Sequence, residues 1–362
     1  MATNLVSLLT SVVLTALIAF LLQVLFFSPI TPHTLELSPA AKELTKWNDA
    51  LQKVEKLGEG MLLGPEDVCI DPEDGALYTA TRDGWIKKMH RNGTWEYWNM
   101  IASDSLLGIK ISKTSPGHIV VIDAQHGVLK ISKNTVTIVA AHCQGSKIPF
   151  ADDGIEASDG NIYFSDASTK FDYHHWYLDV LEAIPHGRLL MYDASTKQTS
   201  VLLDNLAFGN GVTLSKDEDY VVICETWKFR CVKYFLKGDK KGKTEFLVEN
   251  LPGGPDNIKL APDGTFWIAL LEIRVNGYNF LHKSKLAKHF VAAFPSIIEF
   301  FKTRGIYSRA MVVNVDSSGK ILRKFDDSTG KVLHFVTSVL EFEGHLYLGS
   351  LHGNFIGKLP LE

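Results

Sequence analysis

Carboxylate and carboxamide side chains occur at the same point in four similar segments of the chain. They are Glu66, Asp67, Asp152, Asp153, Asn210, Asp256 and Asn257. Carboxylates that gather at one point repel each other unless a cation neutralises them. Carboxylate and amide oxygens, without thiols or imidazoles, are the ligands that a hard cation such as Ca²⁺ prefers. Asp and Asn beside Gly and Pro are also common turn formers, but their shared position in four repeats favours a calcium site.

These polar positions open segments with the pattern of a strand, a polar turn and a second strand. The pattern occurs six times, in Gly64–Thr81, Leu107–Ala124, Asp152–Ala167, Phe208–Thr226, Gly254–Leu270 and Thr337–Leu351. Several spacings between copies lie near the roughly 40–50 residues of a four-stranded propeller blade. The sequence therefore predicts an all-β fold, a six-bladed β-propeller over residues 57–362, whose oxygen donors meet at one rim of the channel. A β-sandwich is the alternative.

Two longer gaps between repeats predict helical insertions. In Lys170–Gly187, apolar residues recur at helical spacing from Trp176 to Ile184. The preceding His174 and His175 are interpreted as ordinary loop residues rather than ligands. In Glu272–Met311, residues 280–301 are predicted to form one amphipathic helix. That helix could cover the channel, rest on a membrane, or pack on the rim without a function of its own.

The N-terminal stretch Leu5–Ile30 contains no charged side chain. An α-helix rises about 1.5 Å per residue, so this stretch is long enough to cross a bilayer. It also exceeds the roughly 7–15 apolar residues of a signal-peptide core. Residues 1–32 are therefore predicted to be a signal anchor, which is favoured over a cleaved signal peptide. Residues 33–56 are predicted to be a linker with a short helix.

The remaining composition limits the compartment and the partners. The net charge is −4 and the sequence contains no basic block, which argues against nucleic-acid binding. The four cysteines form no CxxC pair, so a zinc site is not expected. Cys224 and Cys231 flank a predicted hairpin, where buried free thiols are favoured over a disulfide. Asn92 begins an Asn-Gly-Thr acceptor in an exposed turn. It predicts glycosylation and a luminal domain, at the endoplasmic reticulum membrane or in the vacuole.

The chain resembles plant strictosidine synthase-like proteins over nearly all of Gly64–Leu359. The resemblance is carried by GRLLMYDASTKQTSVLLDNL (Gly187–Leu206), the following GNGV, and GHLYLGSL (Gly344–Leu351). The superfamily also holds the adipocyte plasma-membrane-associated proteins, the gluconolactonases and the paraoxonases, all six-bladed. Its calcium-dependent lactonases bind their ion in the channel. The resemblance implies the calcium ligands Glu66, Asp152, Asn210, Asp256 and Asn257, with Asp256 as the implied catalytic residue. Asp152 departs from the Asn that is usual in paraoxonases.

Other family positions are not matched. The glutamate that strictosidine synthases use as acid and base falls at Thr337, or at Val336 if one residue is gapped. Glu341 lies too near the turn to replace it. The paraoxonase histidine falls near Asp123, and His126 is expected beyond that strand.

The resemblance therefore favours a monomeric ester or lactone hydrolase with a small-molecule substrate. The alternatives are amine–aldehyde condensation in alkaloid biosynthesis and a non-catalytic, membrane-anchored binding protein of the secretory pathway.

Overall fold

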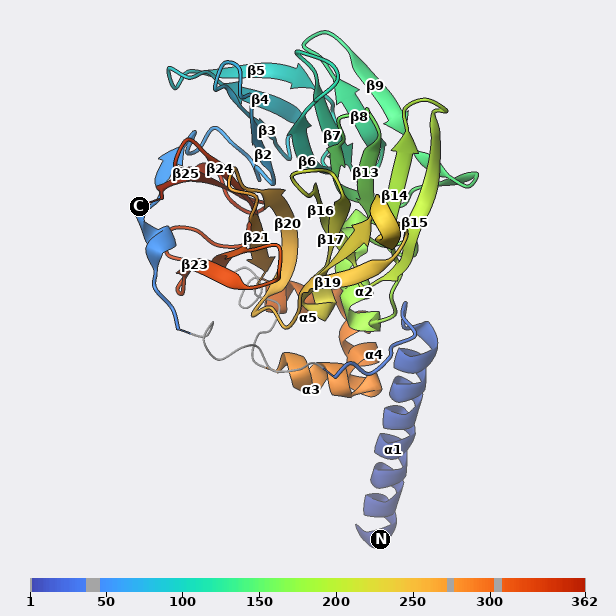
Figure 1. The fold of residues 1–362 in the computed structure, drawn as a ribbon. Coiled ribbons are helices and arrows are strands. Elements are labelled where there is room, and N and C mark those ends of the chain that lie inside the picture. Colours follow the sequence, from blue (N-terminus) through green and yellow to red (C-terminus); the bar gives the residue numbers. More distant parts are fainter. Residues whose placement is uncertain (1, 37–45, 272–276, 303–307, 362) are drawn as a thin grey trace.

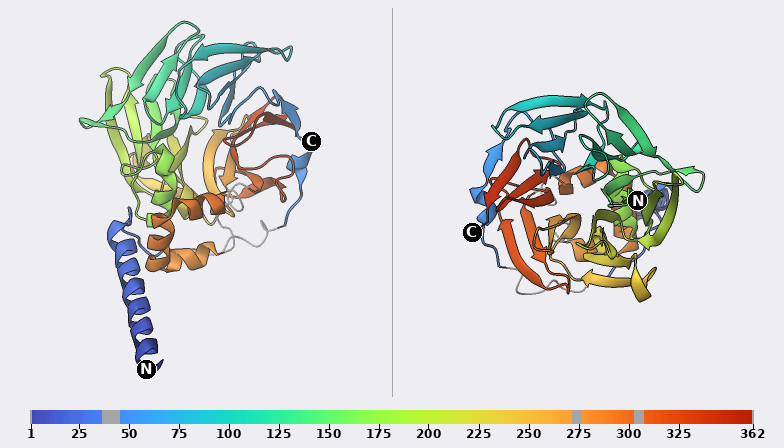
Figure 2. Two further views of the ribbon diagram at one scale, coloured as in Figure 1. Left: turned by 180° about the vertical axis from the view of Figure 1, so that it is seen from behind. Right: turned by 45° about the horizontal axis from the view of Figure 1, so that its top comes forward.

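Six four-stranded antiparallel sheets stand around a central axis, so the chain forms the six-bladed β-propeller that the sequence predicts (Figure 1). The computed structural model describes residues 2–36, 46–271, 277–302 and 308–361. The view along the ring in Figure 2 places the first blade beside the last. Each of the six predicted second strands is the second strand of its sheet.

Five blades each use four strands that follow one another in the chain. The first two contain β2 (Val68–Ile70), β3 (Leu77–Ala80), β4 (Trp85–Met89), β5 (Trp95–Met100), β6 (Leu106–Ile111), β7 (Ile119–Asp123), β8 (Gly127–Ile131) and β9 (Val136–Ala140). The third and fourth contain β12 (Ala151–Glu156), β13 (Ile162–Asp166), β14 (Gly187–Asp193), β15 (Gln198–Leu206), β16 (Gly209–Leu214), β17 (Tyr220–Glu225), β18 (Arg230–Phe235) and β19 (Thr244–Val248). The fifth contains β20 (Gly254–Leu260), β21 (Phe266–Leu271), β22 (Ala310–Val315) and β23 (Ile321–Asp327). Short elements are β10 (His142–Cys143) and β11 (Ser146–Lys147), between the second and third blades, and η4 (Thr226–Lys228) and η5 (Gly238–Lys240), which connect strands of the fourth blade.

The sixth blade joins the two ends of the propeller. It contains β24 (Val336–Phe342), β25 (His345–Ser350), β26 (Ile356–Pro360) and, as its outer strand, β1 (Glu55–Leu57). In the β1–β26 pair, Glu55 lies opposite Lys358. This closure protects the strand edges that an open sheet would expose. The predicted linker thus contains η2 (Ala50–Lys53) and the start of β1, while its residues 37–45 lie outside the described part of the chain.

The core lies between neighbouring sheets. Phe164 of the third blade is fully buried in one cluster with Val120 of the second. Trp267 of the fifth blade is buried in another cluster with Val339 and Leu348 of the sixth. Because each strand of a blade presents side chains on both faces of its sheet, apolar central strands bury both faces only when the sheets stack in a ring.

The first insertion forms the predicted helix. It consists of η3 (Tyr173–His175) and α2 (Trp176–Glu182), which ends at Ala183 in the left-handed conformation. The second insertion does not form one helix, and that prediction is wrong. It forms α3 (Tyr278–Lys283), α4 (Lys285–Ala293) and α5 (Pro295–Phe301). The chain leaves helical geometry at Ser284, which caps α4, and at Phe294 before Pro295, whose ring favours the first turn of a new helix.

The N-terminal helix α1 (Ala2–Phe27) projects away from the propeller (Figure 1). Its segment Val6–Phe27 spans 22 residues with a mean hydropathy of 2.5, which suits a membrane span by length and composition. The prediction of free thiols at Cys224 and Cys231 is wrong, because a disulfide joins them. Strands β17 and β18 place these residues directly opposite each other, with their Cα atoms 4.0 Å apart.

Candidate functional site

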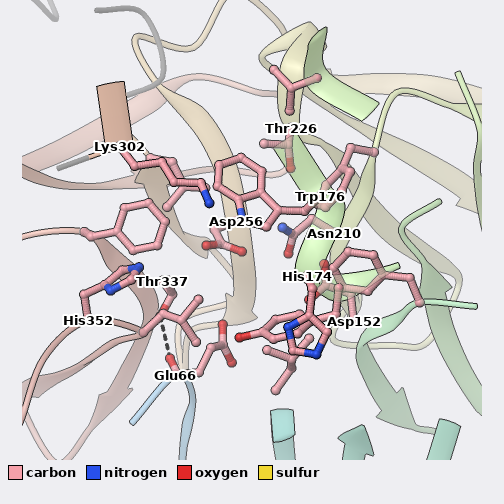
Figure 3. A pocket seen from close by; sticks show the side chains of 18 of the residues that line it. Glu66, Asp152, His174, Trp176, Asn210, Thr226, Asp256, Lys302, Thr337 and His352 are labelled. Carbon is pink, nitrogen blue, oxygen red and sulfur yellow. Dashed lines mark hydrogen bonds between the residues drawn. The ribbon is translucent and has the colours of Figure 1, made fainter. Parts of the chain in front are cut away.

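A pocket of about 210 Å³ occupies the channel where the first strands of the blades begin (Figure 3). Every blade contributes at least one residue from its first strand, or from the turn that precedes it, to the lining. In blade order, one such residue from each blade is Glu66, Leu107, Asp152, Asn210, Asp256 and Thr337. Aromatic rings form much of the remaining wall, namely Phe150, Tyr173, Trp176, Phe208 and Phe335. The pocket therefore combines a polar floor with an apolar wall, as small-molecule sites commonly do.

A break in strand pairing aims these side chains at the channel. In β12, the register with β13 shifts between Ala151 and Gly154, and Asp152 and Asp153 fall in the shift. Blades two, four, five and six have a register shift at the corresponding point of their first strand. Such bulges free residues from the ladder and redirect their side chains. Gly211 lies in the bulge of the fourth blade, where the backbone of the next blade approaches closely. A Cβ at Gly211 would lie 2.3 Å from the Asp256 carbonyl oxygen.

In the adjacent acidic pairs Glu66-Asp67 and Asp152-Asp153, the first residue lines the pocket and the second does not. Asp67 and Asp153 are fully buried but do not line the pocket. Lys110 bridges them, with its Nζ 2.9 Å from Asp67 Oδ2 and 2.6 Å from Asp153 Oδ1. Lys259 contacts the other Asp67 oxygen at 2.5 Å. Burial alone would raise the pKa of Asp67, but the charges of Lys110 and Lys259 hold it well below its usual range. These residues form a neutral network that ties the first strands together.

Sequence reasoning missed Lys110 and Lys259. A signal for them exists, since each is a lysine flanked by aliphatic residues in a first strand, in LGIKIS and NIKLA. A lysine at such a position needs a buried partner.

Glu66 has no lysine partner in the described structure. Its Oε1 accepts a hydrogen bond of 2.7 Å from Asn257 Nδ2, while its Oε2 is buried without a hydrogen-bond partner. Burial and the neighbouring charges of Asp67, Asp256 and Asp152 raise the pKa of Glu66 well above its usual value. A buried carboxylate oxygen without a hydrogen-bond partner costs free energy unless a cation or a proton reaches it.

Asp152 and Asp256 are in a similar environment. Burial raises the pKa of Asp152, and the charge of Asp153 raises it further. Burial and the charge of Asp152 also raise the pKa of Asp256, against a hydrogen bond from Asn210. The Oδ1 atom of Asn210 is buried and has no hydrogen-bond partner. An oxygen-binding cation would relieve both the repulsion and the unpaired oxygens.

The oxygen donors are of the type that a hard cation prefers, but their positions do not form a complete coordination shell. In the part of the chain that the structure describes, no group of three or more His, Cys, Asp or Glu side chains is arranged to hold a metal ion. Of the five predicted ligands, four line the pocket, and Asn257 instead supports Glu66 from behind.

Thr337, Glu341 and His126, which were compared with catalytic positions of related families, lie where the strand pattern predicts. Thr337 lines the pocket, and its hydroxyl donates a hydrogen bond of 2.7 Å to the Glu66 carbonyl oxygen (Figure 3). Glu341 lies outside the lining and accepts a hydrogen bond from Trp267 Nε1 at 2.7 Å. His126 also lies outside it, where its Nδ1 is 2.7 Å from Asp123 Oδ2. Neither Glu341 nor His126 therefore takes the position of the synthase glutamate at Thr337.

The insertions supply the outer rim of the pocket. His174, Trp176 and Lys302 line it, whereas the adjacent His175 points to Asp172, with Nδ1 and Oδ1 2.8 Å apart. His174 therefore belongs to the pocket lining and His175 does not, while the interpretation of both as residues without a ligand role stays a prediction. Asn92 lies in an exposed turn in which its Oδ1 accepts a hydrogen bond from the Thr94 amide.

Comparison with known proteins agrees with this architecture. Residues 153–239 match the strictosidine synthase family model, and residues 46–89 match the model for the strictosidine synthase-like N-terminal region. The adipocyte plasma membrane-associated protein of Gallus gallus is 33% identical, covering 94% of this chain and 86% of that protein. Strictosidine synthase-like protein 6 of Arabidopsis thaliana is 32% identical, covering 86% of this chain and 82% of that protein.

Solved structures share the fold at low sequence identity. A gluconolactonase from Xanthomonas campestris has a TM-score of 0.60 at 13% identity, covering 93% of this chain and 99% of its own. Regucalcin from Agrobacterium tumefaciens, a calcium-binding protein, has a TM-score of 0.55 at 12% identity, covering 91% of this chain and 96% of its own.

Proposed function

The chain belongs to the strictosidine synthase-like family, and from that premise we propose that it hydrolyses esters or lactones with the help of a bound calcium ion. The proposal rests mainly on one contrast between two sets of buried carboxylates. Asp67 and Asp153 are neutralised by lysines. Glu66, Asp152 and Asp256 face the pocket, and no ion pair joins them to a described lysine or arginine. The second set is suited to a cation from solution.

Four pocket residues would hold the ion through their oxygens, namely Glu66, Asp152, Asn210 and Asp256. Asn257 would orient Glu66 through the hydrogen bond that it donates to Oε1. When bound, calcium supplies positive charge that polarises a carbonyl group and stabilises the oxyanion formed from it. The same charge would lower the raised pKa values of these carboxylates and keep them ionised.

Asp256 is the proposed general base. Its carboxylate takes a proton from a water molecule while the water oxygen adds to the substrate carbonyl carbon. The bond between the acyl carbon and the leaving oxygen then breaks, and that oxygen takes the proton. The products are a carboxylic acid and an alcohol, or one hydroxy acid from a lactone. Phe150, Phe208 and Phe335 would pack against the apolar part of the substrate.

The proposed location is the lumen of the endomembrane system, with α1 as the anchor. The Cys224–Cys231 disulfide supports this, because disulfides persist in oxidising compartments and are rare in the cytosol.

A direct test measures bound calcium in the purified full-length protein and screens simple esters and lactones in calcium and in chelator. The expected result is one bound calcium ion and hydrolysis that chelator abolishes. Hydrolysis that persists in chelator would overturn the metal role. Bound calcium without any hydrolysis would favour a non-catalytic binding protein.

A further inference from the structure

A second and larger cavity, of about 790 Å³, lies between the N-terminal helix and the helices of the second insertion. We call it the helical cavity. Its apolar lining includes Leu17, Phe20 and Leu21 of α1 and Leu281, Phe290 and Val291 of α3 and α4. Aromatic contacts join the two sides, with Phe20 6.4 Å from Phe290 and 6.0 Å from Phe294 between ring centroids. Its size is typical of a site for one small organic molecule.

The position of α1 places the helical cavity at membrane depth. The span Val6–Phe27 has 22 residues, or about 33 Å of helix, against roughly 30 Å of hydrocarbon. The α1 residues that line the cavity, Leu17 to Val24, belong to the half of this span nearer the propeller. If α1 crosses the bilayer, the cavity therefore lies within the leaflet that faces the propeller.

Three side chains of the insertion helices line the helical cavity and also remain exposed. Phe280 is 76% exposed, Leu286 49% and Phe290 40%. Large exposed apolar side chains that cluster on short helices are typical of an element lying in a membrane interface. The helical cavity is thus bordered by lipid on one side and by the propeller on the other.

The helical cavity and the channel pocket share a wall. Trp176, Val180 and Lys302 line both of them. The Lys302 ammonium lies 5.5 Å from the centre of a Trp176 ring and 2.8 Å from Glu299. Helix α2 is therefore the partition between an apolar space open toward lipid and the carboxylates of the site.

We propose that the helical cavity receives the acyl chain of an ester or lactone dissolved in the bilayer, and that the carbonyl group passes the shared wall into the channel pocket. This rests on the proposed hydrolase function and specifies its substrate class. An acyl chain that moves from hydrocarbon into an apolar cavity never enters water, so a lipophilic substrate reaches the site without a desolvation barrier. A short, water-soluble ester would instead enter from the aqueous side of the channel.

The test compares p-nitrophenyl butyrate, added to the water, with p-nitrophenyl palmitate, carried in phosphatidylcholine vesicles that hold the full-length protein and calcium. Ala287→Trp adds an indole inside the helical cavity. Ala293→Trp makes the same change on α4 outside its lining, and thermal melting checks that both variants fold. We expect Ala287→Trp to lower the palmitate-to-butyrate ratio of kcat/KM at least tenfold, with Ala293→Trp within twofold of the unmodified protein. An unchanged ratio in folded Ala287→Trp would overturn the proposal.

A second measurement does not depend on turnover. A palmitate ester with a photoreactive diazirine at its chain end is activated in the same vesicles, and labelled peptides are identified by mass spectrometry. Because the carbonyl group lies past the shared wall, the chain end is expected to label Leu181 and Val291, which are buried in the helical cavity and lie outside the channel pocket. Labelling confined to Phe26 and Phe27, which are exposed on α1 outside the cavity lining, would overturn the proposal, since the chain would then only touch the outer surface. Labelled Leu181 and Val291 without hydrolysis of either ester would support acyl binding and refute the hydrolase function alone.

Discussion

Asn257 donates a hydrogen bond of 2.7 Å to Glu66 Oε1 across a sequence separation of 191 residues. The bond joins the fifth blade to the first and holds one Glu66 oxygen, while Oε2 stays without a partner beside the pocket. A carboxylate fixed at one oxygen and unpaired at the other is preorganised for a cation. The predictions below test this arrangement and the elements around it.

Glu66→Gln combined with Asp256→Asn should abolish calcium binding. An ion that binds only the folded state stabilises it by about 2.7 kcal/mol at 100 times its Kd, which corresponds to a Tm loss of about 5 °C on removal. Calorimetry with and without chelator measures both effects. The control, Asp239→Asn with Glu245→Gln, makes the same charge change at exposed sites. If chelator leaves the Tm of the unmodified protein unmoved, the metal site is refuted.

Asp327 provides a pH-dependent stability term away from the pocket. Burial alone would raise its pKa, but the amides of Val332 and Leu333 and the Gln52 side chain lower it to about 2. The folded pKa lies below the ordinary value of 3.8, so this stabilisation is present above pH 3.8 and is lost as pH falls toward 2. The difference corresponds to about 2 kcal/mol at pH 7.

Asp327→Asn should therefore lower the free energy of unfolding by about 2 kcal/mol at pH 7. The gap in unfolding free energy between the unmodified protein and the variant should narrow below pH 4. Urea unfolding between pH 3 and pH 7 measures it. Asp217→Asn, on an exposed turn, is the control and should change little. A gap that stays constant across this range would mean that the carboxylate charge of Asp327 is not what holds the turn.

Condensation chemistry should be absent. Thr337 offers a hydroxyl that cannot exchange protons near neutral pH, and its hydrogen goes to the Glu66 carbonyl. We expect no product from tryptamine and secologanin by mass spectrometry, and little from Thr337→Glu. Cyclised product from the unmodified protein would contradict the hydrolase assignment. Product from Thr337→Glu alone would show that a synthase pocket remains and has lost only its acid and base.

The α1 helix should anchor the protein. Full-length protein is expected to sediment with membranes and to resist carbonate extraction, because its uncharged, predominantly apolar span of 22 residues has the length of the hydrocarbon core. Deleting residues 1–27 should release the propeller into the soluble fraction. A soluble full-length product with a new N-terminus near Pro29–Leu35 would show instead that the segment is a cleaved signal peptide.

Asn92 should carry a glycan if the propeller is luminal. Glycosidase treatment is expected to increase gel mobility, and Asn92→Gln should remove the shift, since Asn92 is the one Asn-X-Ser/Thr acceptor in the sequence. Thr94→Ala, which destroys the acceptor but keeps the asparagine, should behave in the same way. Absence of any shift would count against luminal exposure of this turn.

The sequence by itself determined the ring of blades. The alternation of side chains along a strand and the repeat of strand, turn and strand are local properties, so they can be read without knowing distant contacts. The same repeat placed Glu66, Asp152, Asn210 and Asp256 at one phase of their blades, and the structure brings these four into one pocket.

Tertiary structure alone decided which of two adjacent acidic residues faces the channel. Adjacent residues in a strand point to opposite faces, but the bulges in the first strands set which of Asp152 and Asp153 enters the pocket. Lys110 neutralises Asp67 and Asp153 from the strand that lies between them in the ring. That pairing depends on the packing of consecutive blades, whereas the bond from Asn257 to Glu66 exists only because ring closure brings together blades that the chain keeps far apart.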